Sequence, residues 1–268
     1  MTAMFLERLQ NYGIEKSPYY IYKNDGGKFN PVPSAKSDTA MPNCTDYALC
    51  RGWEASEASK AFPIALPGST GFGNAKTWYD KTPLAKGKEL KVGSIAVFDG
   101  TYGHVAFVER VLDKTHALIS QSQYDANKSL RNYKYFETRE VELVVGKATL
   151  SGIGALIGFI YLPINDIRVN RNSDKEQIEI VQQMVNVRTS PEGYVYREGC
   201  YAPMGIYNVQ DKKEVNGYMW YQLEKDHWVR EGDWLKYYEL SDLANLKKEN
   251  EEMKKAFKEV NLIISKYL

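Results

Sequence analysis

The alternation of apolar and polar positions divides the first part of the chain into helices followed by strands. Amphipathic spacing predicts a short helix over residues 3–12, a second over 44–59 and a brief one over 74–79. Period-two alternation then predicts four strands, over residues 94–98, 104–111, 117–122 and 157–162. Helices first and an antiparallel sheet afterwards indicate an α+β domain, which we assign to residues 1–164.

The pattern changes after a polar, irregular stretch at residues 165–175, which we interpret as a linker. Residues 176–239 contain short aromatic runs that Gly, Pro and Asn interrupt. Four of these runs alternate as half-buried strands do, over residues 184–188, 205–209, 220–223 and 227–229. We therefore expect a small all-β barrel as a second domain.

The last segment, residues 240–268, has the spacing of a heptad repeat. Its a positions hold Leu243, Asn250, Phe257 and Ile264, and its d positions hold Leu246, Met253, Val260 and Tyr267. A polar residue such as Asn250 at an a position commonly fixes register and favours two strands. We expect a short coiled coil that joins two copies of the chain. The alternative is an amphipathic helix folded back on its own domain, which Leu262 and Ile263 keep open because they broaden the apolar face.

Composition narrows the function classes. The 268 residues are 43% hydrophobic and carry a net charge of +1, so nothing draws the protein onto nucleic acid or an anionic membrane surface. The N-terminal residues lack the apolar run of a secretory signal, so we expect synthesis in a cytoplasm and another route to any extracellular substrate. Three cysteines without a C-x-x-C pair disfavour a disulfide framework or a zinc site. No D-x-D pattern precedes Cys44, and we expect neither a metal nor another cofactor.

One cysteine and one histidine have local settings that suit covalent catalysis. Asn43 and Asp46 are placed to cap a helix that begins at Cys44, and a helix N-terminus favours thiolate over thiol. His104 opens a predicted strand directly after Gly103. A thiolate needs an imidazole to hold its charge and to protonate the leaving amine. Taken singly, each residue is more often structural than catalytic, so the interpretation depends on the pair.

Five stretches of the first domain form a recognisable set: NCTDYA at 43–48, GNAKTW at 73–78, VGSIAVF at 92–98, GHVAFVE at 103–109 and IGFIYLP at 157–163. Together they resemble the CHAP family of papain-like cysteine amidohydrolases and peptidases from bacterial cell walls. The second domain contains VNVRTSP at 185–191, GIY at 205–207, GYMWY at 217–221 and WV at 228–229. These stretches resemble a bacterial SH3 (SH3b) wall-binding module. This combination without a signal peptide is similar to phage endolysins of Gram-positive hosts.

The resemblance implies that Cys44 attacks an amide carbonyl to form a thioester and that His104 acts as its ion-pair partner and acid. Relatives often carry Glu and Asn where this chain has Gln121 and Gln123. A glutamine carbonyl can accept a hydrogen bond from His104 Nδ1–H, but it cannot stabilise imidazolium as a carboxylate does. We expect Gln121 to orient the imidazole, with Gln123 as the second choice. The departure implies either reduced activity or compensation by another residue.

The implied function is hydrolysis of Gram-positive peptidoglycan, as an N-acetylmuramoyl-L-alanine amidase or an endopeptidase, after holin-type release from the cytoplasm. The alternatives are a non-catalytic wall-binding or tail-structural protein, and a bacterial autolysin or toxin of the same chemistry. Aromatic residues of the second domain would supply the wall-binding surface, although strand alternation implies that about half of them are core. These candidates are Tyr194, Tyr196, Tyr201, Tyr218, Trp220 and Trp228.

Overall fold

The chain divides into two compact units. The first comprises Met1–Asp166 together with Val195–Pro203, and the second comprises Ile167–Tyr194 together with Met204–Leu268. The computed structural model describes residues 4–10, 44–56, 74–122, 136–148, 153–164, 166, 168, 174–193 and 198–264. A short segment from the middle of the expected second domain therefore groups with the first unit, a departure from the expected domain bounds.

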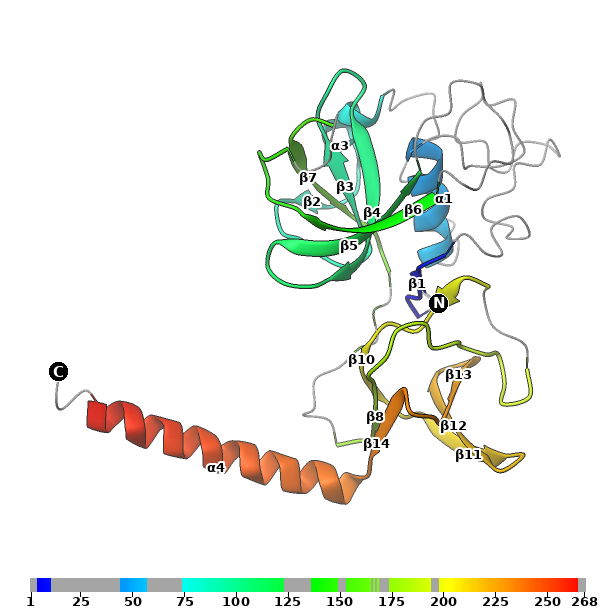
Figure 1. The fold of residues 1–268 in the computed structure, drawn as a ribbon, viewed down its shortest axis with the longest axis vertical. Coiled ribbons are helices and arrows are strands. Elements are labelled where there is room, and N and C mark those ends of the chain that lie inside the picture. Colours follow the sequence, from blue (N-terminus) through cyan, green and yellow to red (C-terminus); the bar gives the residue numbers. More distant parts are fainter. Residues whose placement is uncertain are drawn as a thin grey trace. The chain divides into compact units, whose positions relative to one another are not determined.

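The first unit is built on an antiparallel sheet of six described strands, in the order β2-β7-β3-β4-β5-β6 (Figure 1). The strands are β2 (Lys86–Gly87), β3 (Ser94–Phe98), β4 (His104–Val111), β5 (His116–Ser122), β6 (Phe136–Glu142) and β7 (Leu156–Tyr161). The predicted bounds of β3 and β4 are confirmed, and those of β5 and β7 differ by one residue. The edge strands β2 and β6 were not predicted from the sequence. The α+β class is confirmed.

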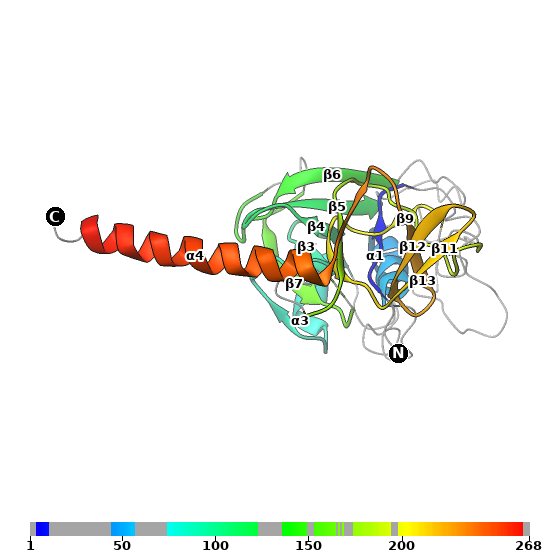
Figure 2. The ribbon, with the colours of Figure 1, turned by 90° about the horizontal axis from the view of Figure 1, so that it is seen from below.

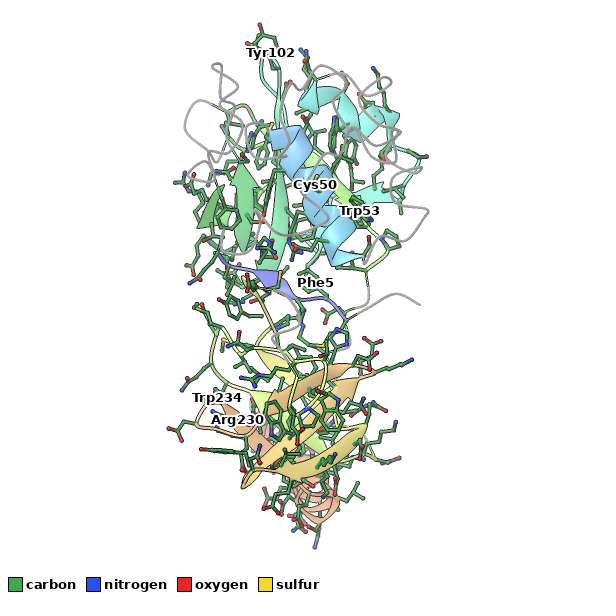
Figure 3. The ribbon with its side chains drawn as sticks, turned by 90° about the vertical axis from the view of Figure 1, so that its right-hand side faces the viewer. Phe5, Cys50, Trp53, Tyr102, Arg230 and Trp234 are labelled. Carbon is green, nitrogen blue, oxygen red and sulfur yellow. The ribbon has the colours of Figure 1, made fainter. Side chains whose placement is uncertain are left out.

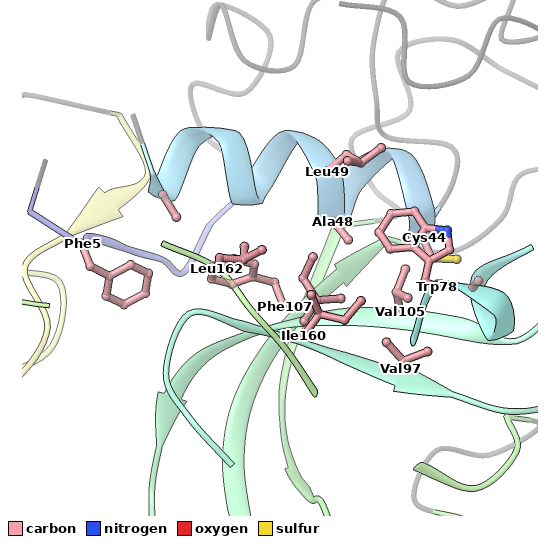
Figure 4. Packing of buried hydrophobic residues seen from close by; sticks show 13 residues of the cluster. Phe5, Cys44, Ala48, Leu49, Trp78, Val97, Val105, Phe107, Ile160 and Leu162 are labelled. Atoms are coloured by element: carbon pink, nitrogen blue, oxygen red, sulfur yellow. The ribbon is translucent and has the colours of Figure 1, made fainter. Parts of the chain in front are cut away.

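Helix α1 (Cys44–Ala55) packs on β4 and β5, and its apolar face builds the main core with the sheet. The short helices η2 (Ala75–Thr77) and α3 (Trp78–Lys81) close one end of this core, where Trp78 lies beside the start of α1 (Figure 4). The helix begins at the predicted residue but is shorter than the predicted 44–59. These contacts place the first turn of α1 over the region from which β4 begins.

The predicted helix over residues 3–12 is wrong where the structure describes it. Residues 7 and 8 form strand β1 (Glu7–Arg8), which pairs antiparallel with β9 (Cys200–Tyr201). Side chains on both faces of this segment are buried, whereas an amphipathic helix would leave one face in water. Glu7 accepts a hydrogen bond from Arg110 of β4 at 2.8 Å. A partner nearly two hundred residues away in sequence therefore overrides the local helical spacing.

A network of buried charges joins β1, α1 and β4. Arg51 donates to both carboxylate oxygens of Glu109 at 2.8 Å, and it contacts Glu54 at 3.1 Å. Arg8 donates to Glu54 at 2.7 Å, and Ser120 donates to Glu109 at 2.6 Å. These charged side chains are about 1% exposed or less. Buried charges are tolerated when they are paired and hydrogen-bonded, so this network fixes the position of α1 on the sheet.

The second unit contains two three-stranded antiparallel sheets among its described residues, in the orders β10-β8-β14 and β11-β12-β13. The strands are β8 (Gln177–Ile180), β10 (Gly205–Asn208), β11 (Asp211–Val215), β12 (Tyr218–Glu224), β13 (His227–Arg230) and β14 (Leu235–Tyr238). Their hydrogen bonds do not close into one barrel, so the expected closed barrel is not observed in this part of the chain. The expected strand at 184–188 contributes an isolated bridge between Arg188 and Trp228.

The chain continues into helix α4 (Leu240–Ile264), in agreement with the predicted helical tail. Figures 1 and 2 show this helix running outward from β14, beyond the two small sheets of its own unit. Leu243 near its start is 2% exposed, whereas Met253, Phe257 and Val260 are 64%, 69% and 52% exposed. The apolar side chains of its middle turns are therefore not covered by their own unit. Among the described residues, no helix is long and apolar enough to cross a membrane.

Candidate active site

Cys44 and His104 are each the first residue of an element that packs against the other. Cys44 begins α1 and is 9% exposed, and His104 begins β4 and is 8% exposed. Cys44 belongs to the same buried cluster as Val105, the neighbour of His104. Further along the two elements, Arg51 of α1 donates to Glu109 of β4. Helix α1 and strand β4 therefore run in the same direction from Cys44 and His104. The nucleophile and imidazole candidates therefore lie at the same end of the helix–sheet packing.

Gly103 sets the position at which β4 begins. Its φ is +73°, and a Cβ at this residue would lie 2.2 Å from the backbone nitrogen of Lys76. The Lys76 amide donates to the carbonyl of Tyr102 at 3.3 Å, which holds η2 against this turn. Only glycine fits both the backbone angle and the close approach. Tyr102 itself is 70% exposed and projects from the tip of the turn, two residues before His104 (Figure 3).

The His104 imidazole is held by Gln121 of β5. The distance between His104 Nε2 and Gln121 Oε1 is 2.7 Å, and Gln121 is 3% exposed. Because a glutamine Oε1 only accepts hydrogen bonds, Nε2 carries the proton of this bond. The expected acceptor is thus in place, but the ring nitrogen differs from the expected Nδ1. This arrangement leaves Nδ1 as the nitrogen that can exchange a proton with a nucleophile.

The carboxylate of Glu137 contacts the side-chain amide of Gln121. Gln121 and Glu137 are register partners on β5 and β6, and Gln121 Nε2 donates to Glu137 Oε2 at 3.3 Å. Burial lowers the pKa of His104, while the Gln121 hydrogen bond and the charge of Glu137 act in the opposite direction. Glu137 is not among the predicted site residues, because strand β6 was not predicted from the sequence. The weak signal was the run of charged residues around Val141 in residues 136–142, because charged side chains are typical of an edge strand.

Several expected residues fall elsewhere. Gln123, Asn43, Tyr194 and Tyr196 lie outside the described residues, as does the side chain of Asp46. Tyr201 belongs to β9 of the first unit, where it is buried and donates to Gln10 at 3.3 Å. It is therefore not part of the second unit to which we assigned it.

The remaining aromatic candidates lie in the second unit. Trp220 and Trp228 are 5% and 8% exposed and form a small cluster with Val215. Tyr218 is 46% exposed. Of these three, Tyr218 is the only one with an exposed side chain. In the described ranges, no three His, Cys, Asp or Glu side chains converge as metal ligands would.

A cysteine at a helix start and a histidine at a strand start on an antiparallel sheet are residue types in positions that suit a cysteine hydrolase. Residues 35–123 match the family model of the CHAP domain, so this part of the chain is a CHAP domain. The matched span contains Cys44, His104 and Gln121. It ends before β6, and so it does not include Glu137.

Solved structures with some similarity to the chain include two of Ly7917. The structure of Ly7917 with the hydrolysing product of MDP shares 14% sequence identity, covers 71% of this chain and 84% of that chain, and gives a TM-score of 0.32. Another structure of Ly7917 shares 14% identity, covers 76% of this chain and 95% of that chain, and gives a TM-score of 0.30. No curated protein matches the chain.

Proposed function

We propose that the protein is a peptidoglycan hydrolase that cleaves an amide bond of the Gram-positive cell wall through a thioester on Cys44. The observation that carries the proposal is the 2.7 Å hydrogen bond between His104 and Gln121, within a CHAP domain whose cysteine begins α1. A buried imidazole needs a hydrogen-bond partner, and here Gln121 supplies it from the next strand and so fixes the orientation of the ring at the start of β4. The bond cleaved is an N-acetylmuramoyl-L-alanine amide or a peptide bond of the stem or cross-bridge.

The mechanism follows from the residues. The Cys44 thiolate attacks the carbonyl carbon, and the backbone N–H of the same residue donates to the developing oxyanion, a contribution of typically ~3 kcal/mol to the barrier. His104 Nδ1–H protonates the departing nitrogen, and the thioester remains. His104 then takes a proton from water as the water attacks the thioester, which releases the acid and restores the Cys44 thiolate beside protonated His104. Throughout, Nε2–H stays bonded to Gln121.

Glu137 acts in this scheme as a positioning residue. Its carboxylate accepts from the amide group of Gln121 and thereby fixes which end of that amide faces the imidazole. It also places a negative charge behind a neutral acceptor, which favours imidazolium. The chain therefore distributes over two residues the role that a single carboxylate fills in related enzymes.

The second unit is the proposed SH3b wall-binding module, and the whole chain is a proposed phage endolysin. The sequence stretches that resemble SH3b support the first statement, and the combination with a CHAP domain supports the second. Synthesis in the host cytoplasm and holin-type release would bring the enzyme to its wall.

We propose further that α4 joins two copies of the chain. Its heptad seam is supported by the exposure of Met253, Phe257 and Val260, which leaves apolar area for a partner helix to cover. Two tethered wall-binding modules would raise the effective concentration of the second at the wall. The hydrolytic chemistry does not depend on this association.

The experiment that tests the hydrolase follows the turbidity of Gram-positive walls with the parent protein, Cys44→Ala and Cys50→Ala, with mass spectrometry of released fragments. Cys50 is also a buried cysteine of α1, so its variant controls for the loss of a thiol from the helix. Lysis by the parent and Cys50→Ala but not by Cys44→Ala is expected, and the fragments name the bond. Equal lysis by all three proteins would exclude Cys44 as the nucleophile. No lysis by any of them, on walls that the protein binds, would favour the non-catalytic wall-binding alternative.

A further inference from the structure

A groove of about 310 Å³ lies in the second unit, in a part of the chain remote in sequence from Cys44 and His104. Trp220, Trp234, Arg188 and Arg230 line it, together with residues 182–186 of the preceding loop. Figure 3 shows Arg230 and Trp234 side by side. Ligand sites typically combine aromatic walls with a few polar groups, and this groove has that composition.

The strand register places the charged and aromatic side chains of the groove together. Trp220 and Arg230 are direct partners across β12 and β13, and Arg188 is bridged to Trp228 on the other side of β13. Residues 228 and 230 alternate to the same face of their strand, so Trp220, Arg230 and Arg188 share one face of this sheet. The ring of Trp234 lies 5.8 Å from the Arg230 guanidinium carbon. The arrangement is thus a property of the backbone pairing.

Both arginines stack on aromatic rings. The guanidinium carbon of Arg230 lies 4.4 Å from the ring centroid of Tyr218 and 5.8 Å from that of Trp234, and that of Arg188 lies 5.3 Å from Trp220. Such a cation–π contact restrains the side chain. A restrained guanidinium still offers N–H groups in the fork geometry that suits carboxylate and phosphate.

The positive charge of the groove is not neutralised locally. None of the residues that line it is an aspartate or glutamate. In the part of the chain that the structure describes, neither Arg188 nor Arg230 forms an ion pair with a carboxylate, although the described arginines at positions 8, 51, 110 and 139 all do. Two stacked guanidinium groups without a counter-charge therefore face the same groove. Met184 of the lining loop has a φ of 64°, a left-handed conformation that is uncommon for a residue other than glycine and clusters at binding sites.

We propose that this groove binds an anionic group, a carboxylate or a phosphate, carried on a polymer of the cell wall. Arg188 and Arg230 hold the anion through their N–H edges, and Trp220 and Trp234 contact the apolar or sugar part that carries it. The side-chain amides of Gln182 and Asn186 at the rim pair with neighbouring hydroxyl or amide groups. The proposal rests on the proposed action at the wall, and it adds the chemical class that the second unit recognises. The two sources of such an anion are the free carboxylates of peptidoglycan stem peptides and the phosphodiesters of wall-linked polymers.

The test measures binding of the full chain to purified Gram-positive walls by co-sedimentation, in a Cys44→Ala background in which the wall stays intact. The double variant Arg188→Gln/Arg230→Gln is compared with Lys213→Gln/Lys236→Gln, which removes the same charge from exposed positions of the same unit. Loss of two charge-assisted hydrogen-bonding groups predicts binding at least about tenfold weaker for the arginine variant. The lysine variant is expected to bind like the parent.

A second comparison keeps the charge and removes the fork. Arg188→Lys/Arg230→Lys is expected to bind more weakly than the parent and more tightly than the glutamine variant, because lysine cannot bind an anion in the bidentate manner. Thermal unfolding of each variant identifies any that fails to fold. If the glutamine variant does not fold, Arg188→Lys/Arg230→Lys is compared with the parent instead, because both of its side chains keep their charge.

Walls stripped of phosphodiester polymers with hydrofluoric acid distinguish the two anions. Loss of the arginine-dependent binding on stripped walls identifies phosphate, and its retention identifies the carboxylate; either result supports the groove. Equal binding by Arg188→Gln/Arg230→Gln and Lys213→Gln/Lys236→Gln would overturn the proposal. Failure of the parent to bind walls would overturn it as well. Because binding is measured without catalysis, arginine-dependent binding combined with no lysis by the wild-type enzyme would refute the proposed hydrolase and leave this site standing.

Discussion

Gln121 Nε2 donates to the carboxylate of Glu137 at 3.3 Å while Oε1 of the same amide accepts from His104 at 2.7 Å. A glutamine amide has distinct donor and acceptor ends, and the carboxylate binds only the donor end. The acceptor end must therefore face the histidine. The carboxylate that favours imidazolium therefore lies on β6 and not on β5. Hydrogen bonds through Gln121 connect it to His104.

This connection predicts that exchanging the two side chains preserves function. Glu137→Gln should lower kcat/KM on the order of tenfold, because a neutral acceptor forms a weaker hydrogen bond than a charged one. The exchange variant Gln121→Glu/Glu137→Gln should recover activity, since it places a carboxylate on His104 and an amide behind it. Kinetics on soluble wall fragments measures both. Glu140→Gln is the matched control, since residue 140 lies on the same strand with its side chain on the other face. Equal kinetics for Glu137→Gln and Glu140→Gln would refute the positioning role.

The same geometry predicts the titration of His104. Burial lowers the pKa of this histidine, and the hydrogen bond that His104 donates to Gln121 and the charge of Glu137 partly offset the effect. Unfolded His104 binds its proton near pH 6.5, above the folded value. The stability that depends on it is therefore fully present above about pH 6.5 and is lost as the pH falls through the folded pKa.

NMR titration of the imidazole signals of Cys44→Ala measures this pKa directly, without the thiolate that would favour imidazolium in the parent. Glu137→Gln should lower the pKa of His104 further, because it removes the charge that favours imidazolium, and Glu140→Gln should leave it unchanged. A His104 signal that titrates above the pH range of unfolded histidine would contradict the assignment of burial as the dominant cause.

Much of the site was readable from the sequence because its parts are local. The bounds of β4 and the start of α1 follow from alternation and capping signals, and Gln121 follows from its place on the next strand. Glu137 was not readable, since its edge strand is dominated by charged residues and hides the hydrophobic alternation. The pairing of β1 with β9 was also beyond reach, because it joins residues 7–8 to residues 200–201. Local periodicity carries no information about a partner at that separation.

The buried network around Glu109 predicts a large and specific loss of stability. Glu109→Gln removes the charge that Arg51 contacts through two hydrogen bonds, and it leaves a fully buried guanidinium without that counter-charge. Removing one partner of a buried ion pair costs about 3–5 kcal/mol. Urea unfolding monitored by tryptophan fluorescence measures the change.

Glu142→Gln is the control for this variant, because Glu142 pairs with Lys147 at an exposed position and should change stability little. If the two variants unfolded at the same urea concentration, Glu109 would not have the structural role assigned to it. The catalytic constants of Glu109→Gln at a temperature where it is folded should stay close to those of the parent, since Glu109 lies several residues along β4 from His104.

The heptad seam of α4 predicts a dimer that a single charge disrupts. The side chains of Met253, Phe257 and Val260 are more than half exposed in one chain, and burying a large apolar side chain contributes about 1.5–3 kcal/mol. Sedimentation equilibrium should therefore give twice the 30.6 kDa mass of one chain for the parent and that of a single chain for Phe257→Lys. Glu252→Lys introduces the same residue at an exposed position outside the a and d seam, and it should remain dimeric. A parent protein that sediments as a monomer at all concentrations would remove the coiled coil, and lysis of walls by that monomer would show that hydrolysis needs only one chain.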